Sequence, residues 1–217
     1  MLKAIIFDLD GVIINSEYYW SLVEFDLLRS LVPSWDKEKH QTIIGKSVSD
    51  VYSSLRKNYP INLSCDEFMK VYDKIACDLY ATKVEICDGC LEFALDAKKR
   101  GLKLGISSSS PRKWIDLVVN RFKLNELFDV IVSSDDIPGS SKPSPDLYIH
   151  TVRKLGVVNN ESIAIEDSKN GIIAAKAAGI YCVAFNNGYN NHPDLALADL
   201  VINKFNELKV KFFTKPL

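Results

Sequence analysis

The chain has 217 residues, of which 47% are apolar, and its formal net charge at pH 7 is −1. This length suits one sizeable hydrophobic core, or a core domain with a small second domain. The balanced charge argues against nucleic acid or anionic lipid as a partner, and no stretch approaches the roughly 18 apolar residues of a membrane span.

The N-terminal segment and the cysteines indicate the compartment. The apolar run after Met1 is too short for a secretory signal and soon reaches Asp8. The five cysteines are scattered, and the only CxxC, Cys87 to Cys90, has no second ligand pair at zinc-binding spacing. We therefore expect a cytoplasmic protein with reduced thiols. Because no extended apolar stripe favours an obligate oligomer, we expect a monomer.

The first predicted element is a short buried strand at residues 3–7. Its apolar side chains end at two acids, Asp8 and Asp10, which is typical of a parallel strand that finishes at a polar edge. A helical segment follows, because residues 16–83 contain no convincing buried strand and place apolar side chains at helical spacing. The predicted helices of this segment lie at 17–32 with Ser16 as candidate N-cap, at 48–58, and at 65–81 with a capping box of Ser64 and Glu67.

From about residue 84 onward, strands alternate with helices. The predicted strands lie at 102–107, 129–133, 162–165, 180–185 and 199–202. The predicted helices lie at 90–100, 112–122, 145–155 and 169–178. Such alternation implies a parallel sheet with right-handed crossovers.

The predicted fold is therefore α/β, a Rossmann-like doubly wound parallel sheet with an inserted all-helical cap. Residues 1–15 and 84–217 form the α/β core domain, and residues 16–83 form the cap domain. An insertion placed just beyond the acidic end of the first strand lies over that end, as a lid does.

Ligands of open parallel sheets bind outside the carboxyl ends of the strands. The predicted strand ends and the loops that follow them carry these residues: Asp8, Asp10, Ser107 to Ser110, Lys142, Glu166 and Asp167. Four converging carboxylates repel one another, and Mg²⁺ is a cation that prefers carboxylates together with water and phosphate oxygens.

The remaining residues at the strand ends suit a phosphate group. Gly11 allows a sharp turn after the second acid, and serine hydroxyls at a helix start suit phosphate oxygens. Lys142 supplies a positive charge for a developing phosphoryl anion. Together these residues predict phosphoryl transfer, for which a carboxylate nucleophile that forms an aspartyl-phosphate is an established solution.

Four segments of the chain resemble the four motifs of the haloacid dehalogenase-like (HAD) superfamily, in the same order and over essentially the whole chain. The segments are Asp8-Leu9-Asp10-Gly11-Val12, the serine after the second core strand, Ser141-Lys142-Pro143-Ser144-Pro145-Asp146, and Ile165-Glu166-Asp167-Ser168 with Gly171. The resemblance is greatest to the branch with a small helical cap, which holds β-phosphoglucomutase-like proteins and many sugar-phosphate phosphatases.

The resemblance implies catalytic roles for four residues. Asp8 would be the nucleophile and a Mg²⁺ ligand. Asp10 would protonate the leaving oxygen and later activate the second acceptor, while its backbone carbonyl binds the metal. Ser108 matches the hydroxyl of the second motif. Lys142 would steady Asp8 and the phosphoryl group.

Further residues receive binding roles from the same resemblance. Glu166 and Asp167 would be the acidic metal pair, with Asp167 the more direct ligand. Ser109, Ser110 and Gly11 would lie close to the phosphate. The presence of a second acid two residues after the first favours phosphoryl transfer over dehalogenation, because the dehalogenases of the superfamily lack it.

The cap determines which reaction is expected. Trp20 stands where the mutases carry a histidine, and Val48 stands where they carry a cap arginine, so we expect a phosphatase acting on a small phosphorylated metabolite, in particular a sugar phosphate. A sugar-phosphate mutase and a non-catalytic HAD-like binding module remain the alternatives. Lys46 and Trp20 are candidates for contact with the substrate. Three isolated histidines receive no catalytic role: His40, His150 and His192.

Overall fold

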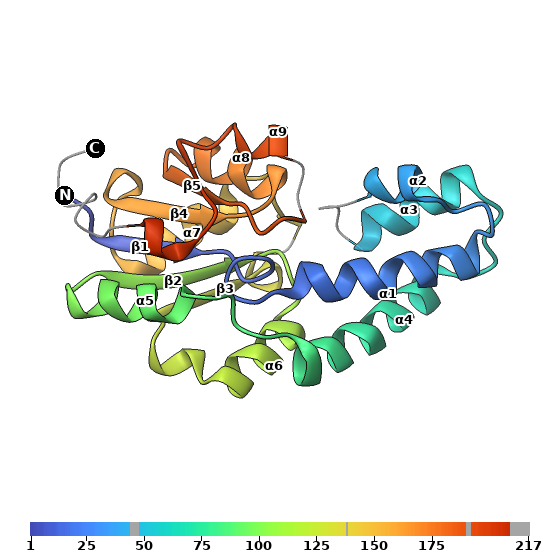
Figure 1. The fold of residues 1–217 in the computed structure, drawn as a ribbon, viewed down its shortest axis with the longest axis horizontal. Helices are drawn as coiled ribbons and strands as arrows, with labels where there is room; N and C mark the ends of the chain where they lie inside the picture. Colours follow the sequence, from blue (N-terminus) through green and yellow to red (C-terminus); the bar gives the residue numbers. More distant parts are fainter. Residues whose placement is uncertain (44–47, 138, 190–191, 209–217) are drawn as a thin grey trace.

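The structure is a computed structural model of the chain, and it describes residues 1–43, 48–137, 139–189 and 192–208. Figure 1 shows two parts, an α/β part built around a sheet and a helical part formed by α1 to α4. This arrangement confirms the predicted fold class.

All six described strands are parallel, in the order β3-β2-β1-β4-β5-β6. The strands are β1 (Ala4–Phe7), β2 (Lys103–Ser108), β3 (Val130–Ser133), β4 (Ser162–Glu166), β5 (Tyr181–Phe185) and β6 (Leu200–Ile202). Because β1 lies between β2 and β4, its carboxyl end is at the centre of the sheet edge. The order reverses at β1, and such a switch point is where open sheets bind ligands.

Helices cover both faces of the sheet. They are α5 (Cys90–Lys99), α6 (Arg112–Phe122), α7 (Asp146–Leu155), α8 (Lys169–Ala177) and the short α9 (His192–Leu195). Alternate residues of β1 face opposite ways. Ile5 and Phe7 pack in the cluster that includes α5 and α6, whereas Ala4 and Ile6 pack in the cluster that includes α7 and α8. This two-sided burial accounts for the continuous apolar run of the strand.

The helical part has a hydrophobic core of its own, which includes Leu28, Val51, Phe68 and Tyr72. Its elements are α1 (Ser16–Leu31), α2 (Lys37–Gln41), α3 (Val48–Asn58), α4 (Cys65–Asp78) and a π-helical turn, η1 (Leu79–Lys83). The division into a core of 1–15 with 84–217 and a cap of 16–83 stays our proposal. Among the described helices, none has both the length and the apolar character needed to cross a membrane.

One local prediction needs correction, and one short helix was missed. The short helix α2 was not predicted, because its five residues bury no side chain and therefore show no apolar period. The N-cap position of α1 is Asn15 and not Ser16. Ser16 is the first helical residue, and its Oγ accepts a hydrogen bond from the Gly11 amide at 3.2 Å. Ser64 and Glu67 form the predicted capping box at the start of α4.

Three further single-turn helices lie in the connections of the α/β part, and a fourth follows β6. They are η2 (Leu124–Glu126), η3 (Ser134–Asp136), η4 (Asn159–Glu161) and η5 (Phe205–Glu207).

Candidate active site

The carboxyl ends of β1 and β4 bring three buried acids together. The register pairs Phe7 with Ile165, and the Asp8 amide donates to the Ile165 carbonyl at 2.9 Å, which places Asp8 beside Glu166. The exposed fractions of the acids are 7% for Asp8, 0% for Glu166 and 2% for Asp167. One carboxylate oxygen from each of the three lies within 4.8 Å of the others.

The donor set fits a hard divalent cation, because all three ligand atoms are carboxylate oxygens. Burial, reinforced by neighbouring acids, raises the pKa of Asp8 and of Asp167 well above the usual range. Proximity of a cation would favour the charged form of both groups and so offset this electrostatic cost. The residues that the structure describes therefore supply less positive charge than the site requires.

Among the described residues, Lys142 supplies the cation at this position. Its Nζ lies 2.8 Å from Asp8 Oδ1 and 2.5 Å from Glu166 Oε1, and it donates to the Ser107 carbonyl at 2.9 Å. Burial opposes the charge of Lys142, but Asp8 and Glu166 outweigh it and raise the pKa of the ammonium. The lysine is therefore fixed and charged beside Asp8.

Glu166 is held from several sides. Tyr148 donates to its Oε1 at 2.7 Å, and Oε2 accepts from the Asp167 amide at 3.2 Å and from the Ser168 hydroxyl at 3.2 Å. A Cβ on Gly171 would lie 1.9 Å from the Glu166 carboxyl carbon, so this glycine leaves room for the carboxylate. Glu166 therefore orients Lys142 in addition to lying in the candidate metal cluster.

Asp167 is oriented by Asn187, a residue that sequence reasoning missed. The Asn187 amide nitrogen donates to Asp167 Oδ2 at 2.8 Å and to the Gly11 carbonyl at 2.9 Å. Gly11 has a φ of +71°, and a Cβ there would lie 1.9 Å from Asp167 Oδ2. Gly11 thus shapes the turn, and it is absent from the lining of the cavity described below. Asn187 follows the carboxyl end of β5. Because ligands of parallel sheets bind outside the carboxyl ends of the strands, a search of the residues after β5 would have found it.

Asp10 is held by residues outside the three-acid cluster. Its Oδ2 accepts hydrogen bonds from Ser110 Oγ at 2.7 Å and from Ser108 Oγ at 3.4 Å, and its Oδ1 accepts from the Tyr80 hydroxyl at 2.6 Å. The structure thus joins Ser108 and Ser110 to Asp10. Metal binding through the Asp10 carbonyl stays a prediction.

Tyr80 is the second residue that the sequence analysis missed. It lies in the π-helical turn η1, is 2% exposed, and accepts a hydrogen bond from Trp20 Nε1 at 3.3 Å. Its ring packs against Trp114 at a centroid distance of 5.8 Å. No sequence pattern marks this tyrosine, because its neighbours are joined only when α1, η1 and α6 pack together.

We expect the variant Tyr80→Phe to lower kcat about tenfold. The phenylalanine keeps the packing but removes the hydrogen bond that holds Asp10, and one such bond to a charged group contributes about 1.5–3 kcal/mol. An unchanged kcat would show that Tyr80 only packs.

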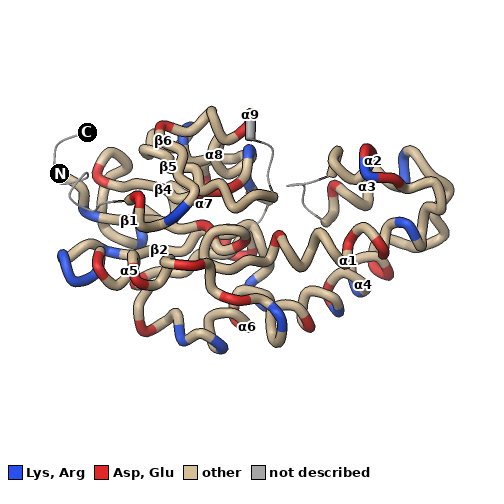
Figure 2. The backbone as a smooth tube through the Cα atoms, in the orientation of Figure 1, with Lys and Arg blue, Asp and Glu red and all other residues tan. Residues whose placement is uncertain are grey.

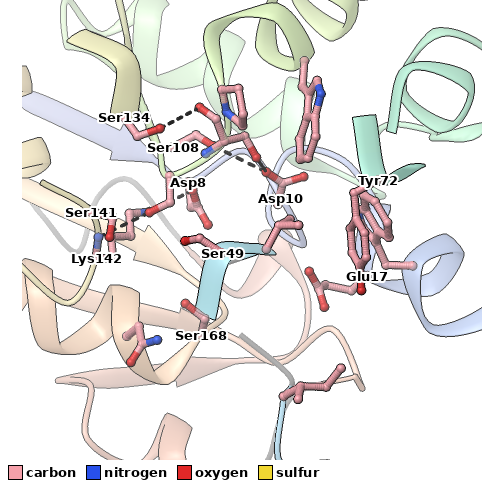
Figure 3. Close-up of a pocket in the computed structure, with 18 of the residues that line it drawn as sticks. Asp8, Asp10, Glu17, Ser49, Tyr72, Ser108, Ser134, Ser141, Lys142 and Ser168 are labelled. Carbon is pink, nitrogen blue, oxygen red and sulfur yellow. Dashed lines mark hydrogen bonds and ion pairs between the residues drawn. The ribbon is translucent and has the colours of Figure 1, made fainter. Parts of the chain in front are cut away.

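A cavity of about 800 Å³ lies between the strand ends and the helical part. Figure 3 shows Asp8, Asp10, Ser108 and Lys142 on one side of it, and Glu17 and Tyr72 opposite. Ser109 and Ser110 also line it, as does Trp20, whereas Lys46 lies outside the described residues.

The cavity is acidic although the protein as a whole is nearly neutral. Figure 2 shows Lys and Arg distributed over both parts of the molecule. Among the described lining residues, however, one lysine, Lys142, faces six carboxylates. The six are Asp8, Asp10, Glu17, Glu24, Asp135 and Asp167. This imbalance again favours a bound cation.

Glu24, in the helical part, is a carboxyl group whose charge reduces stability. Burial raises its pKa to about 6, although the hydrogen bond from Tyr72 lowers it. Below about pH 4.5 the group is protonated in both the folded and the unfolded chain. Between pH 4.5 and 6 only the unfolded chain releases the proton, so stability falls as the pH rises, and the loss is complete above about pH 6.

We therefore expect Glu24→Gln to raise the free energy of unfolding by about 1–2 kcal/mol at pH 8 and to leave it nearly unchanged at pH 4. The amide keeps an oxygen acceptor for Tyr72. Urea denaturation at the two pH values checks this, with the exposed Asp26→Asn on the same helix as the control. An equal effect at both pH values would contradict the assignment of the destabilisation to ionised Glu24.

Comparison with known proteins agrees with this geometry. Residues 5–185 match the family model for haloacid dehalogenase-like hydrolases. The chain is 32% identical over 213 residues to hexitol phosphatase B of Escherichia coli, covering 97% of this chain and 96% of that protein. It is 28% identical to the phosphorylated carbohydrates phosphatase of Thermotoga maritima, covering 82% of each.

A solved structure of β-phosphoglucomutase from Clostridium difficile is also similar. Its TM-score is 0.80 at 26% identity, and the match covers 99% of this chain and 96% of that one. The family match spans most of the chain, and both curated relatives given above are phosphatases. The chain belongs to the haloacid dehalogenase-like hydrolase family, as a phosphatase of its β-phosphoglucomutase-like branch.

Proposed function

We propose that this protein is a Mg²⁺-dependent phosphatase that hydrolyses a small sugar phosphate or related polyol phosphate through an aspartyl-phosphate on Asp8. The observation that carries the proposal is the position of Asp8, whose carboxylate lies 2.8 Å from a buried lysine and within 4.8 Å of two further acids. A carboxylate so placed is a nucleophile beside charges that stabilise a phosphoryl group.

The first step forms a bond between an Asp8 carboxylate oxygen and phosphorus while the ester P–O bond breaks. Asp10 gives a proton to the leaving oxygen, which becomes an alcohol. In the second step Asp10 takes a proton from water, the water oxygen bonds to phosphorus, and the Asp8–phosphorus bond breaks to release phosphate. Lys142 stabilises the negative charge of the phosphoryl group in both steps, because it is fixed beside Asp8.

Asp8, Asp167 and Glu166, together with the carbonyl of Asp10, would hold the Mg²⁺ ion. When bound, the ion supplies positive charge that neutralises the phosphoryl oxygens. Ser108, Ser109 and Ser110 would then provide hydroxyl and amide donors to the same oxygens, since all three line the cavity. These assignments follow the order of the motifs along the chain.

Two observations favour a carbohydrate phosphatase over a mutase. The similar proteins from Escherichia coli and Thermotoga maritima carry hexitol and carbohydrate phosphates in their names. The indole of Trp20 donates a hydrogen bond to Tyr80. An indole is a donor only, so it cannot exchange protons as the histidine at the matching mutase position can.

The test measures phosphate release by purified protein from p-nitrophenyl phosphate and from hexose and hexitol phosphates. We expect activity with Mg²⁺, complete loss after chelation with EDTA, and full recovery when Mg²⁺ returns. Conversion of β-glucose 1-phosphate to glucose 6-phosphate faster than phosphate release would show a mutase. Inactivity across the whole panel, with and without metal, would show a binding module.

A further inference from the structure

The helical wall of the cavity contains a histidine whose tautomer is fixed by its neighbour. Trp35 Nε1 donates a hydrogen bond to His40 Nδ1 at 3.3 Å. An indole nitrogen only donates, so His40 Nδ1 is the acceptor and the neutral ring carries its proton on Nε2. Burial lowers the pKa of His40, which favours this neutral form. His40 lines the cavity and therefore offers an N–H donor to it.

Glu24 lies beside this donor and offers an acceptor. Tyr72 donates to Glu24 Oε1 at 2.8 Å, while Oε2 lies 3.9 Å from His40 Nε2. That distance exceeds a hydrogen bond. In the described part of the chain neither Glu24 Oε2 nor His40 Nε2 has a hydrogen-bond partner. The side chains are 17% and 13% exposed, and both line the cavity.

A donor and an acceptor at this spacing match a hydroxyl group. One hydroxyl accepts from His40 Nε2 and donates to Glu24 Oε2, so that both are satisfied at once. The surrounding wall is aromatic, with Trp20 stacked on Tyr72 at a centroid distance of 5.7 Å and an interplanar angle of 22°. Pockets with a few placed polar groups among aromatic side chains are typical of small-molecule sites.

The acids among the described residues of this wall oppose a second phosphate. Glu17 also lines the cavity, and burial, reinforced by Asp10 and Glu24, raises its pKa to about 7. Figure 3 shows Glu17 across the cavity from Asp8. At pH 8, above the pKa of both Glu17 and Glu24, a dianionic group at this end would meet two carboxylates, and like charges in contact disfavour binding.

We infer that Glu24 and His40 form a hydroxyl-binding subsite that selects the neutral, polyhydroxylated end of a sugar or polyol monophosphate and disfavours bisphosphates. The inference rests on the proposed function, because it places the phosphate at Asp8 and the carbon chain toward the helical part. It assigns the specificity of the enzyme to α1 and α2. The catalytic strand ends are not part of this subsite.

The experiment compares kcat/KM for sorbitol 6-phosphate, glucose 1,6-bisphosphate and p-nitrophenyl phosphate in the wild type and in variants. The wild type should have a higher kcat/KM for sorbitol 6-phosphate than for glucose 1,6-bisphosphate. Glu24→Ala and His40→Phe should each lower kcat/KM for sorbitol 6-phosphate, relative to kcat/KM for p-nitrophenyl phosphate, about tenfold. A loss of this size is expected when one polar partner of the substrate is removed. Glu24→Gln keeps an oxygen for Tyr72 and should mainly relax discrimination against the bisphosphate.

A binding arm separates this inference from the proposed function. In an Asp8→Asn background, calorimetry with Mg²⁺ gives the affinity for sorbitol 6-phosphate and for inorganic phosphate. Suppose that the added Glu24→Ala change abolishes the tighter binding of sorbitol 6-phosphate over inorganic phosphate, while the wild-type protein releases no phosphate from any ester. This pair of results would support the subsite and reject the phosphatase.

The opposite pattern would reject the subsite alone. The inference would be overturned if the protein is an active phosphatase but the ratios of kcat/KM between substrates change less than twofold in all three variants. It would also be overturned if the wild type binds the bisphosphate as tightly as the monophosphate. The exposed Asp26→Asn on α1 is the matched control and should leave every ratio unchanged.

Discussion

Replacing Asp8 by asparagine should abolish phosphate release from every ester, with a loss of about 10⁴-fold or more, the scale seen when the nucleophile of a covalent mechanism is removed. The amide has nearly the shape of the carboxylate but lacks the charge and nucleophilicity that the first step needs. Activity is measured on p-nitrophenyl phosphate and on the best sugar phosphate found in the panel.

The fold should survive this change. Asp8 is one of three buried acids, and burial together with repulsion from Glu166 already disfavours its charge. An amide at this position relieves that repulsion while it still accepts a hydrogen bond from Lys142. Circular dichroism and the melting temperature should therefore remain close to those of the wild type. Rates within about tenfold of the wild type would remove Asp8 as the nucleophile.

Replacing Lys142 by methionine should damage both stability and turnover. The methionine nearly preserves the volume of the side chain but leaves Asp8 and Glu166 buried without their cation. Removing one partner of a buried ion pair typically costs about 3–5 kcal/mol. Turnover should fall by about 10²–10³-fold, the loss found when a charge-stabilising donor is removed from an active site.

The loss of stability in Lys142→Met should be smaller at pH 5 than at pH 8, because a buried carboxylate without a cation protonates more readily. Lys98→Met is the matched control, since Lys98 pairs with Asp129 at 2.6 Å but both side chains are more than a third exposed. Exposed pairs contribute about 0–1 kcal/mol. A loss in Lys142→Met no larger than that control would contradict the buried arrangement around Asp8.

The strands of the α/β part were predictable because burial on both faces of a parallel sheet leaves a direct mark on the sequence. Buried parallel strands read as apolar runs, and each run ends where the chain reaches the polar edge of the sheet. The acid that follows β1 and the acids at the end of β4 could therefore be placed on one edge. The register of Phe7 with Ile165 then brings them together.

Residues joined only by tertiary packing were not predictable. Tyr80 reaches Asp10 across 70 positions, and Trp20 reaches Tyr80 across 60. His40 lies in a short helix with no apolar period, so its contact with Trp35 could not be foreseen. We assigned this histidine no catalytic role, and the inferred subsite gives it a binding role instead.

The stereochemical course of hydrolysis at phosphorus tests the central claim most directly. A phosphate ester made chiral with oxygen isotopes is hydrolysed by the Mg²⁺ enzyme in isotopically labelled water, and the configuration of the released phosphate is determined. Each in-line displacement inverts the phosphorus centre. Transfer to Asp8 followed by transfer to water predicts net retention, whereas net inversion would show direct attack by water and would contradict an aspartyl-phosphate.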